Sequence, residues 1–368
     1  MALPQTQQHS LRWLLWAGTG LTLVYLVACC STILHPQTFP YITFLTIGFP
    51  FLFVGYLVWC VLAFYVWGKK SAWWAFLLLA AGPNLSYLWG TGWGKPEPVK
   101  SKTLTVLSWN VNEFFQGYEN DHVWQPKRER MLAYIQEKQP DVLCFQDYAE
   151  SAGFRAENLS HLIARTLQYP YHYFSKDATD YGTAIFSRFP IVEQGHYPYK
   201  TKERSESLAF ADLLIKGDTV RVFNTHFSSM FLHHNRLGIH NVGTIEVVKE
   251  DTSFLFHSNR WQRMQHYDVV HSAQAKQAKI FMNASPHPFV FCGDLNAVPN
   301  SHVYSQLKKG LKDAFLEERF GMEGTYHSFN PILRIDVILY SPAFQSLHQE
   351  SPRLDLSDHY PLLARFTW

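Results

Sequence analysis

The first 94 residues contain no aspartate or glutamate, and their only formally charged side chains are Arg12, Lys69 and Lys70. A water-soluble fold normally carries both signs of charge on its surface, so this absence of acids excludes an ordinary soluble domain here. The remaining 29 basic and all 30 acidic residues follow from Lys95 onward and give that part a net charge of −1. The abrupt boundary predicts a membrane region over residues 1–94 and a water-soluble domain after it.

Three long apolar runs fill the membrane region, at residues 13–34, 41–67 and 72–89. Each run is long enough to cross a bilayer as a helix. A first apolar run alone could be a cleaved signal peptide, but two more runs follow it and no small-residue cleavage site is present. The sequence therefore predicts three transmembrane helices.

Positive charge near helix ends indicates which end faces the cytoplasm. Lys69 and Lys70 lie between the second and third runs, and Arg12 precedes the first, so we expect the rest of the chain on the outer side. Three lysines between residues 95 and 102 oppose this orientation by an equal count. We expect a protein of the bacterial inner membrane whose water-soluble domain faces the periplasm.

Cysteine is scarce and shows no pattern. Of the five cysteines, Cys29, Cys30 and Cys60 lie in the long apolar runs, and Cys144 and Cys292 lie in short apolar stretches of the soluble domain. These positions exclude a disulfide framework and a cysteine-based metal site, and they are typical of buried thiols.

The order of the expected elements favours one fold class. A polar linker with two prolines, residues 95–103, leads into a soluble domain at 104–368. Many expected strands there are adjacent in sequence, and residues 181–192 read as one strand, which favours two packed sheets flanked by helices over a doubly wound parallel sheet. Residues 228–260 show a weak pattern and histidines without metal spacing, so we expect a surface insertion, either a lid or a membrane-facing element.

Polar residues able to do chemistry follow several of the expected strands. Such residues are common where a strand meets a turn, so each short motif alone is a weak signal. Their joint occurrence is much less expected by chance. In chain order they are Asn110 and Asn112 of "WNVN", Asp147 of "FQD", His226 of "NTH", Asp294 and Asn296 of "GDLN", Asp336 of "RID", and Asp358 and His359 of "SDH".

These motifs make the region from about residue 104 to 368 resemble the endonuclease/exonuclease/phosphatase family. That family includes deoxyribonucleases, neutral sphingomyelinases and inositol polyphosphate phosphatases. The resemblance implies an α/β fold, a four-layer α/β sandwich of two central mixed sheets flanked by helices, with the site at the strand ends. It also implies a metal-dependent phosphoric ester hydrolase. The stretches that follow the family order are "WNV", "PDVLCFQD", "GTAIFSR", "NTHF", "GDLN", "RIDVIL" and "SDHYP".

The resemblance implies a Mg²⁺ or Mn²⁺ ion, which offsets the negative charge of a phosphoester and prefers oxygen ligands. Asp147 would be its main ligand, together with Asn110 and Asp358. The family usually has glutamate at the position of Asp147, so the carboxylate here reaches less far by one methylene. Asn112 stands where some members carry the aspartate of a second metal site, so we expect one metal rather than two.

The resemblance also assigns the groups that activate water. His359 would be the general base, since an imidazole pKa near 6.5 suits that role, and Asp336 would orient it. Asp294 and Asn296 would position the water and a phosphoryl oxygen. His226 would donate a hydrogen bond to the developing negative charge.

Structural roles remain alternatives for several of these residues. Asn110 and Asn296 could satisfy backbone groups at strand ends, and Asp336 could pair with Arg334. Tyr181, before the glycine of "YGT", is expected to pack rather than to take part in chemistry.

The substrate is the feature that the sequence determines least. A net charge near −1 lacks the basic excess typical of nucleic-acid-binding domains, so nucleic acid is an alternative partner and not the favoured one. The membrane region favours a phosphoester at the membrane surface, such as a lipid headgroup. Our first hypothesis is a membrane-tethered phosphodiesterase or phosphatase, the second a membrane-anchored DNA or RNA endonuclease, and the third a catalytically silent binding protein.

Overall fold

The computed structural model defines most of the chain. The linker predicted at 95–103 and the insertion predicted at 228–260 lie largely outside the described residues. The described residues are 5–92, 101–115, 121–150, 159–177, 181–201, 206–230, 259–327 and 332–368.

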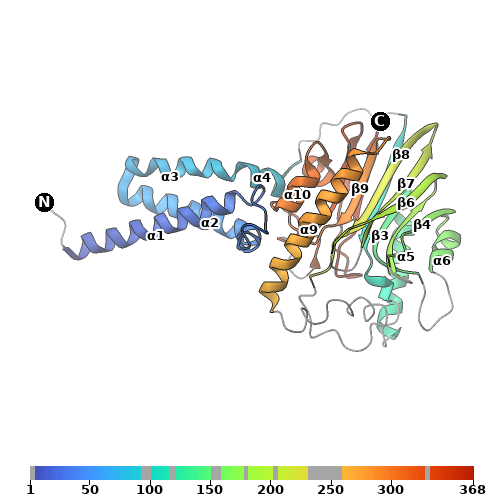
Figure 1. The fold of residues 1–368 in the computed structure, drawn as a ribbon, viewed down its shortest axis with the longest axis horizontal. Coiled ribbons are helices and arrows are strands. Elements are labelled where there is room, and N and C mark those ends of the chain that lie inside the picture. The colour runs from blue at the N-terminus through green and yellow to red at the C-terminus, as the bar shows by residue number, and fades with distance from the viewer. Residues whose placement is uncertain are drawn as a thin grey trace.

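Two mixed six-stranded sheets form the centre of the larger domain (Figure 1). Each contains one parallel pair, β2 with β3 and β8 with β9, and its other pairs are antiparallel. One sheet has the order β13 (Gln345–Glu350), β14 (Leu362–Thr367), β2 (Thr103–Asn110), β3 (Val142–Ala149), β5 (Tyr181–Ser187), β4 (Tyr171–Phe174). The other has the order β10 (Lys312–Asp313), β12 (Asp336–Tyr340), β9 (Phe289–Asp294), β8 (Asp218–His226), β7 (Ser207–Ile215), β6 (Ile191–Pro198).

Strand β2 shows why the central strands are almost continuously apolar. Its Leu104 and Val106 pack into the core between the two sheets, together with Val222 and Val290 of the facing sheet. Its Trp109 points to the opposite face and packs under the helices. Because successive side chains alternate in direction, a strand buried on both faces needs apolar residues at nearly every position.

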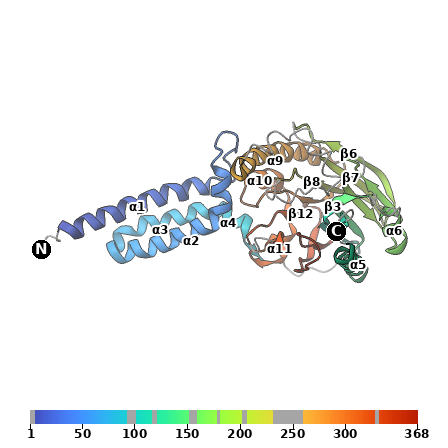
Figure 2. The ribbon, with the colours of Figure 1, turned by 90° about the horizontal axis from the view of Figure 1, so that it is seen from below.

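Helices cover the outer faces of both sheets (Figure 2). On one side, α5 (Asp121–Lys138) and α6 (Leu159–Thr166) contribute residues to the core outside the sheet that contains β2. On the other side, α9 (Arg260–Asn283) and α10 (His302–Lys308) pack on the sheet that contains β9. The result is an α/β sandwich of two mixed sheets with helices on both faces, which confirms the predicted fold of this domain.

The single strand predicted over residues 181–192 is wrong. The chain forms β5, turns at residues 188–190, and begins β6 in the other sheet. Ser187 stabilises the turn, since its hydroxyl accepts a hydrogen bond from the Phe189 amide at 2.9 Å and donates one to the Phe189 carbonyl. Pro190 follows and separates the two strands.

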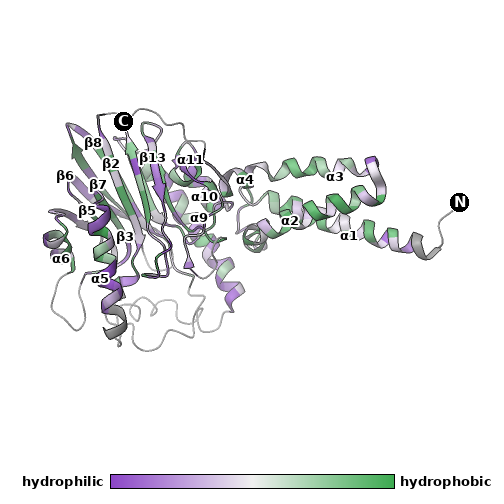
Figure 3. Ribbon diagram, turned by 180° about the vertical axis from the view of Figure 1, so that it is seen from behind, coloured by the Kyte–Doolittle hydropathy of each residue, from purple (hydrophilic) through white to green (hydrophobic). Residues whose placement is uncertain are grey.

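The N-terminal helices form a bundle that projects away from the sandwich (Figures 1 and 2). Figure 3 shows that the bundle is largely hydrophobic. Its elements are α1 (Gln5–Cys29), α2 (Ile42–Trp67), η1 (Gly68–Ser71), α3 (Ala72–Phe76), η2 (Leu77–Ala81) and α4 (Gly82–Leu88). A short β1 (Gly90–Thr91) follows and pairs with β11 (Phe320–Gly321), which comes after α11 (Ala314–Glu318).

Only two stretches of the described chain, not the predicted three, are long and apolar enough by length and composition to cross a membrane. They are His9–Cys29 and the helical run Ile42–Leu88. The predicted third span, residues 72–89, is not a separate helix of that length. It is divided into short α and 3₁₀ segments that follow η1, where the chain reverses and runs back beside α2 to the sandwich (Figures 1 and 2), and Gly82 and Pro83 begin the last of these segments.

Candidate active site

The strand ends that carry the predicted residues meet at one edge of the sandwich. β8 and β9 are parallel, and their register pairs His226 with Asp294. β12 runs antiparallel to β9 and pairs Asp336 with Asp294, so it begins where the other two end. In the second sheet, β2 ends at Asn110, and the parallel strand β3 carries Asp147 close to its own end. The topology therefore gathers residues that are far apart in the sequence.

His359 is held against Asp336 by its ring and by its backbone. Its Nδ1 lies 3.0 Å from Oδ2 and 3.2 Å from Oδ1 of Asp336, and both side chains are buried. Trp109 Nε1 donates to the His359 carbonyl at 3.0 Å, and Tyr326 forms a β-bridge with His359. Burial lowers the pKa of His359, but the carboxylates of Asp336 and Asp294 outweigh burial and raise that pKa well above its ordinary value.

Arg334 pairs with Asp313 and not with Asp336, the partner that the sequence left open. Its Nη1 donates to Asp313 Oδ2 at 2.8 Å. Asp336 keeps both carboxylate oxygens near His359, and its backbone amide donates to Thr325 Oγ1 at 3.0 Å. Asp336 therefore pairs with His359 and not with Arg334.

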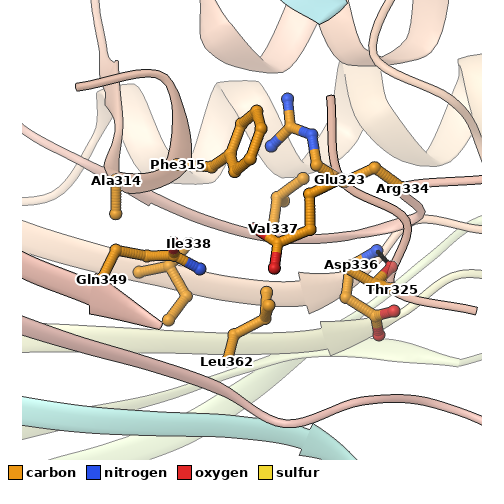
Figure 4. Close-up of a pocket in the computed structure, with 10 residues that line it drawn as sticks. All are labelled: Ala314, Phe315, Glu323, Thr325, Arg334, Asp336, Val337, Ile338, Gln349 and Leu362. Carbon is orange, nitrogen blue, oxygen red and sulfur yellow. Dashed lines mark hydrogen bonds between the residues drawn. The ribbon is translucent and has the colours of Figure 1, made fainter. Parts of the chain in front are cut away.

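A small pocket lies beside Asp336 (Figure 4). It is lined by residues of β12 and of neighbouring segments, among them Phe315, Glu323 and Gln349. Its lining includes neither His359 nor Asp294. The pocket therefore belongs to the packing around β12 and is not the place where His359 would meet a substrate.

Asp294 is the central carboxylate of the cluster. Its Oδ2 accepts a hydrogen bond from Asn110 Nδ2 at 3.0 Å, and its Oδ1 accepts one from the Asn296 amide at 2.9 Å. The same Oδ2 lies 3.6 Å from His359 Nδ1 and 3.6 Å from His226 Nε2. Burial raises the pKa of Asp294. One carboxylate thus connects residues from both sheets.

The "GDLN" turn places Asn296 beside His226. Asn296 adopts a left-handed backbone with φ of 47°, which asparagine tolerates better than most residues. Its Nδ2 donates to the Phe227 carbonyl at 2.9 Å and lies 3.3 Å from His226 Nε2. Gly293 allows close strand approach, because a Cβ there would lie 2.8 Å from Thr225 Cγ2.

Asp147 sits at a β-bulge in β3 and has a left-handed backbone with φ of 48°. The bulge re-aims its side chain, and Oδ1 lies 3.5 Å from His226 Nδ1. Burial raises the pKa of Asp147, the charge of His226 lowers it, and the carboxylates of Asp358 and Asp294 raise it further. Asp147 therefore belongs to a group of carboxylates that repel one another.

His226 lies among several acids. Burial lowers its pKa, but Asp147, Glu206 and Asp294 outweigh burial and raise the pKa of His226 to about 9. A pKa in this range favours the protonated ring, in which both nitrogens can donate hydrogen bonds.

Two of the residues around His226 were not predicted for the site. Glu206 is buried and places Oε1 3.8 Å from His226 Nδ1, and the Tyr181 hydroxyl lies 3.4 Å from the same nitrogen. Glu206 stands alone before a strand with no motif around it, so the sequence offered no signal for it. Tyr181 was expected only to pack.

A buried polar bridge joins the two sheets behind these residues. Gln146 Nε2 donates to Asn224 Oδ1 at 2.7 Å and to Ser108 Oγ at 3.0 Å. Asn224 Nδ2 donates to the Phe145 carbonyl at 2.8 Å and to the Ala184 carbonyl at 3.0 Å. All these groups are buried, so the bridge fixes the spacing of the sheets next to the site.

The carboxylates form a donor set that fits a divalent cation. Among the described residues, the ligand atoms of Asp294, Asp336 and His359 lie within 4.8 Å of one another. The exposed Asp358 adds a carboxylate whose charge raises the pKa of Asp147. Repelling carboxylates of this kind are stabilised by a bound cation, and oxygen donors suit Mg²⁺ or Mn²⁺.

Comparisons with known proteins identify relatives of the fold. A zebrafish (D. rerio) TDP2 humanized by 14 mutations has a similar structure, with a TM-score of 0.52 at 18% identity over 72% of this chain and 99% of that one. An endonuclease/exonuclease/phosphatase protein from Beutenbergia cavernae gives a TM-score of 0.51 at 18% identity over 72% of each chain. Zebrafish TDP2 with a single-stranded DNA product gives 0.51 at 16% identity over 73% of this chain and 100% of that one. These likenesses show a common fold.

A search of curated proteins found no match. The model of one family does match the sequence, over residues 107–359, which include every residue of the cluster described above. The matched region is more than half of the chain. The chain therefore belongs to the endonuclease/exonuclease/phosphatase family.

Proposed function

We propose that this protein is a membrane-tethered, divalent-metal-dependent phosphoesterase that hydrolyses a phosphodiester or phosphomonoester with a water activated by His359. The observation that carries the proposal is the buried His359–Asp336 pair facing Asp294. Asn296 and His226 lie within reach of the same carboxylate. This combination of a base, its orienting acid and several hydrogen-bond donors suits attack on a phosphoester.

Asp147, Asn110 and Asp358 would hold a Mg²⁺ or Mn²⁺ ion. Bound there, the ion would offset the charge of the phosphoester and of Asp358, one of the carboxylates that raise the pKa of His359. Asp147 has the family's carboxylate chemistry with a shorter side chain, and Asn112 favours one ion over two.

The chain's own residues would move the proton and orient the substrate. Asp336 would accept a hydrogen bond from Nδ1–H of His359, so that the proton stays on Nδ1 and the unprotonated Nε2 can take a proton from water. Asp294 and Asn296 would position that water and a phosphoryl oxygen. His226 would donate a hydrogen bond to the oxygen on which negative charge develops.

A membrane location follows from the helical bundle in this proposal. The N-terminus and the Lys69–Lys70 turn lie at the end of the bundle that points away from the sandwich (Figures 1 and 2). With these cations in the cytoplasm, the catalytic domain would lie on the periplasmic side of a bacterial inner membrane. The division into a membrane region at 1–94, a linker at 95–103 and a catalytic domain at 104–368 belongs to the same proposal.

The preferred substrate class is a phosphoester at the membrane surface, such as a lipid headgroup. The membrane tether and the soluble domain's net charge of −1 favour it over long nucleic acid. A nuclease function is the second candidate, because one structure with the same fold contains a single-stranded DNA product.

The test uses the full chain in detergent micelles with Mg²⁺ or Mn²⁺. An activated phosphodiester, an activated phosphomonoester, single-stranded DNA, plasmid DNA and sphingomyelin or phosphatidylinositol vesicles are compared as substrates. Metal-dependent turnover with lipid preferred supports the proposal, and DNA preferred supports the nuclease. A folded protein that turns over nothing on this panel supports a silent binding protein.

A further inference from the structure

The loop that carries Asn296 is hydrogen-bonded to the N-terminal helices. Asn300 follows in the same loop, and its Nδ2 donates to the Thr46 carbonyl of α2 at 2.8 Å. The Asn300 carbonyl accepts a hydrogen bond at 2.6 Å from the hydroxyl of Ser31, just after α1. Asn300 and Ser31 are each 1% exposed, so water does not replace these bonds.

A third helix joins the same point. Asn84 of α4 is fully buried, and its Nδ2 donates to the Ala28 carbonyl of α1 at 3.0 Å. Its Oδ1 lies 3.4 Å from the Ser31 hydroxyl that also contacts Asn300. Helices α1, α2 and α4 therefore converge on the loop after β9.

The segment that leads into β12 is also hydrogen-bonded to the N-terminal helices. Arg334 precedes Asp336 by two residues, and its Nη2 donates to the Tyr87 carbonyl of α4 at 3.1 Å. Its Nη1 is paired with Asp313, and both side chains are buried. A charged hydrogen-bond network in the interior has few alternative arrangements, because each unpaired group would be strongly destabilising.

We propose that Asn300 and Arg334 are positioning residues through which the N-terminal helices set the active-site geometry. Asn300 holds the loop of Asn296, and Arg334 holds the strand of Asp336. The helices are then part of the catalytic unit and not only a tether. This inference rests on the proposed function of the same site.

The matched control is a polar contact in the same interface that does not touch the catalytic loop. Thr43 of α2 donates through Oγ1 to Asp268 Oδ2 of α9 at 2.6 Å. Asn300→Ala and Thr43→Val each remove one hydrogen bond between the bundle and the sandwich, which is buried for Asn300 and partly buried for Thr43. Both variants should therefore lower the melting temperature of the full chain.

We would measure kcat and KM for hydrolysis of an activated phosphodiester by the full chain in micelles with Mg²⁺, for the wild type and for each variant. Asn300→Ala should lower kcat roughly tenfold with KM unchanged, because a small displacement of catalytic groups affects the chemical step. Thr43→Val should leave kcat unchanged. Ser31→Ala removes the hydrogen bond to the Asn300 carbonyl and should also lower kcat. It replaces Asn300→Ala in the test if that variant does not fold.

Equal kcat in the loop variants and in Thr43→Val would overturn the positioning role. If the wild-type chain shows no metal-dependent turnover, the proposed function fails and hydrogen exchange decides the inference. Amides at 295–301 should then exchange up to about tenfold faster in Asn300→Ala than in Thr43→Val. Equal exchange in the two variants would refute the connection as well.

A second inference rests on exposed aromatic side chains. Among described residues after 100, the large exposed aromatics are Tyr171, Trp261 and Phe320. Trp261 is 63% exposed and meets Phe44 of α2 edge-on, with ring centroids 5.1 Å apart. Phe320 is 78% exposed and meets Trp89, after α4, edge-on at 5.7 Å. Two of the three thus lie where the sandwich meets the bundle.

The loop between α1 and α2 adds to this surface. It exposes Ile33 and Tyr41, at 72% and 68%. Large exposed apolar side chains are unfavourable in water but stable at the boundary between headgroups and acyl chains. We infer that Trp261 and Phe320 contact the lipid interface and hold the catalytic domain against the bilayer, provided that the proposed membrane region spans it.

Photocrosslinking of the full chain in phosphatidylglycerol and phosphatidylethanolamine nanodiscs tests this contact. Benzoylphenylalanine replaces Trp261 or Phe320, and the controls place it at Ile280, on the same helix as Trp261, or at Tyr171. Both controls are exposed: Ile280 lies near the C-terminal end of α9, and Tyr171 begins β4, an edge strand on the side of the sandwich opposite the bundle (Figure 1). Crosslinks to phospholipid are expected at 261 and 320 and not at the controls.

Equal crosslinking at all four positions would overturn the lipid contact. Alkaline carbonate extraction of native membranes distinguishes failure of the proposed membrane region from failure of the lipid contact at Trp261 and Phe320. A chain that is extracted refutes the membrane region and this inference together, whereas a chain that stays in the membrane leaves the crosslinks to decide the inference alone.

Discussion

At the scale of single residues, one carboxylate organises the site. Asp294 accepts hydrogen bonds from Asn110 and Asn296 and lies 3.6 Å from both His226 and His359. Each histidine has further acids beside it, which keep the pKa of both rings above the ordinary value. Charge in the cluster is therefore strongly coupled, and a neutral substitution at one acid should affect the whole group.

Asp336→Asn tests the orientation of His359. The amide keeps the shape of the side chain but removes the charge that fixes the Nδ1 proton. We expect kcat to fall by about 10²- to 10⁴-fold, the range typical of general acid–base groups, with the fold retained. Steady-state kinetics together with circular dichroism checks this result. Activity close to wild type in a folded variant would exclude Asp336 as the orienting acid.

Asp147→Asn tests the metal ligand. Loss of one carboxylate from the donor set should raise the Mg²⁺ concentration needed for half-maximal activity by about tenfold or more. The measurement is a Mg²⁺ titration of the hydrolysis rate, with Glu150→Gln as the neighbouring control. An unchanged titration curve for Asp147→Asn would remove this residue from the metal site.

At the scale of elements, the contact between α2 and α9 contains a titratable group. Burial raises the pKa of Asp268, and the hydrogen bond from Thr43 lowers it in part. The folded state therefore binds this proton more tightly than the unfolded state. The contribution of Asp268 to the free energy of unfolding therefore decreases as pH rises from the unfolded-state pKa, near 3.9, toward the higher folded-state pKa.

Asp268→Asn should remove that dependence while keeping an acceptor for Thr43. We expect the variant to melt at a higher temperature than wild type near neutral pH and at the same temperature near about pH 3 to 4. Thermal unfolding of the full chain across this pH range measures the difference. A difference independent of pH would show that desolvation of Asp268 does not control this contact.

The sequence predicted features that depend on local pattern. Motifs beside strands, such as "GDLN" after β9 and "SDH" before β14, could be located because a change between apolar and polar residues is visible in one segment. The strand at 181–192 was wrong because Ser187 and Pro190 form a turn inside an apolar stretch. Glu206 and Asn300 were missed because their partners lie in other elements, and no local signal marks such contacts.

The third membrane span was wrong for a related physical reason. Hydropathy measures composition, and residues 72–89 are as apolar as a span. It does not report that the chain reverses at Gly68–Ser71, or that the returning segment is divided into short α and 3₁₀ helices, the last of which begins at Gly82 and Pro83. The length of a helix depends on its backbone hydrogen bonds, and composition alone does not tell where a proline or a turn changes them.

At the scale of the whole molecule, the family fold and the helical bundle form a connected unit. The bundle reaches the β9 loop through Asn300, the β12 strand through Arg334 and α9 through Thr43. A sandwich domain attached at three points has a restricted orientation relative to the bundle. In the proposed function, this restriction would present the active site to substrates at one fixed angle to the membrane.

The measurement that tests the central claim most directly is hydrolysis of an activated phosphodiester by the full chain, with Mg²⁺ or with excess EDTA. Wild type is compared with His359→Ala, and melting temperatures confirm that both are folded. We expect turnover with Mg²⁺, none with EDTA, and a loss of about 10²-fold or more in the variant. Turnover that persists in folded His359→Ala would exclude His359 as the base, and turnover that does not require the metal would exclude metal-dependent hydrolysis.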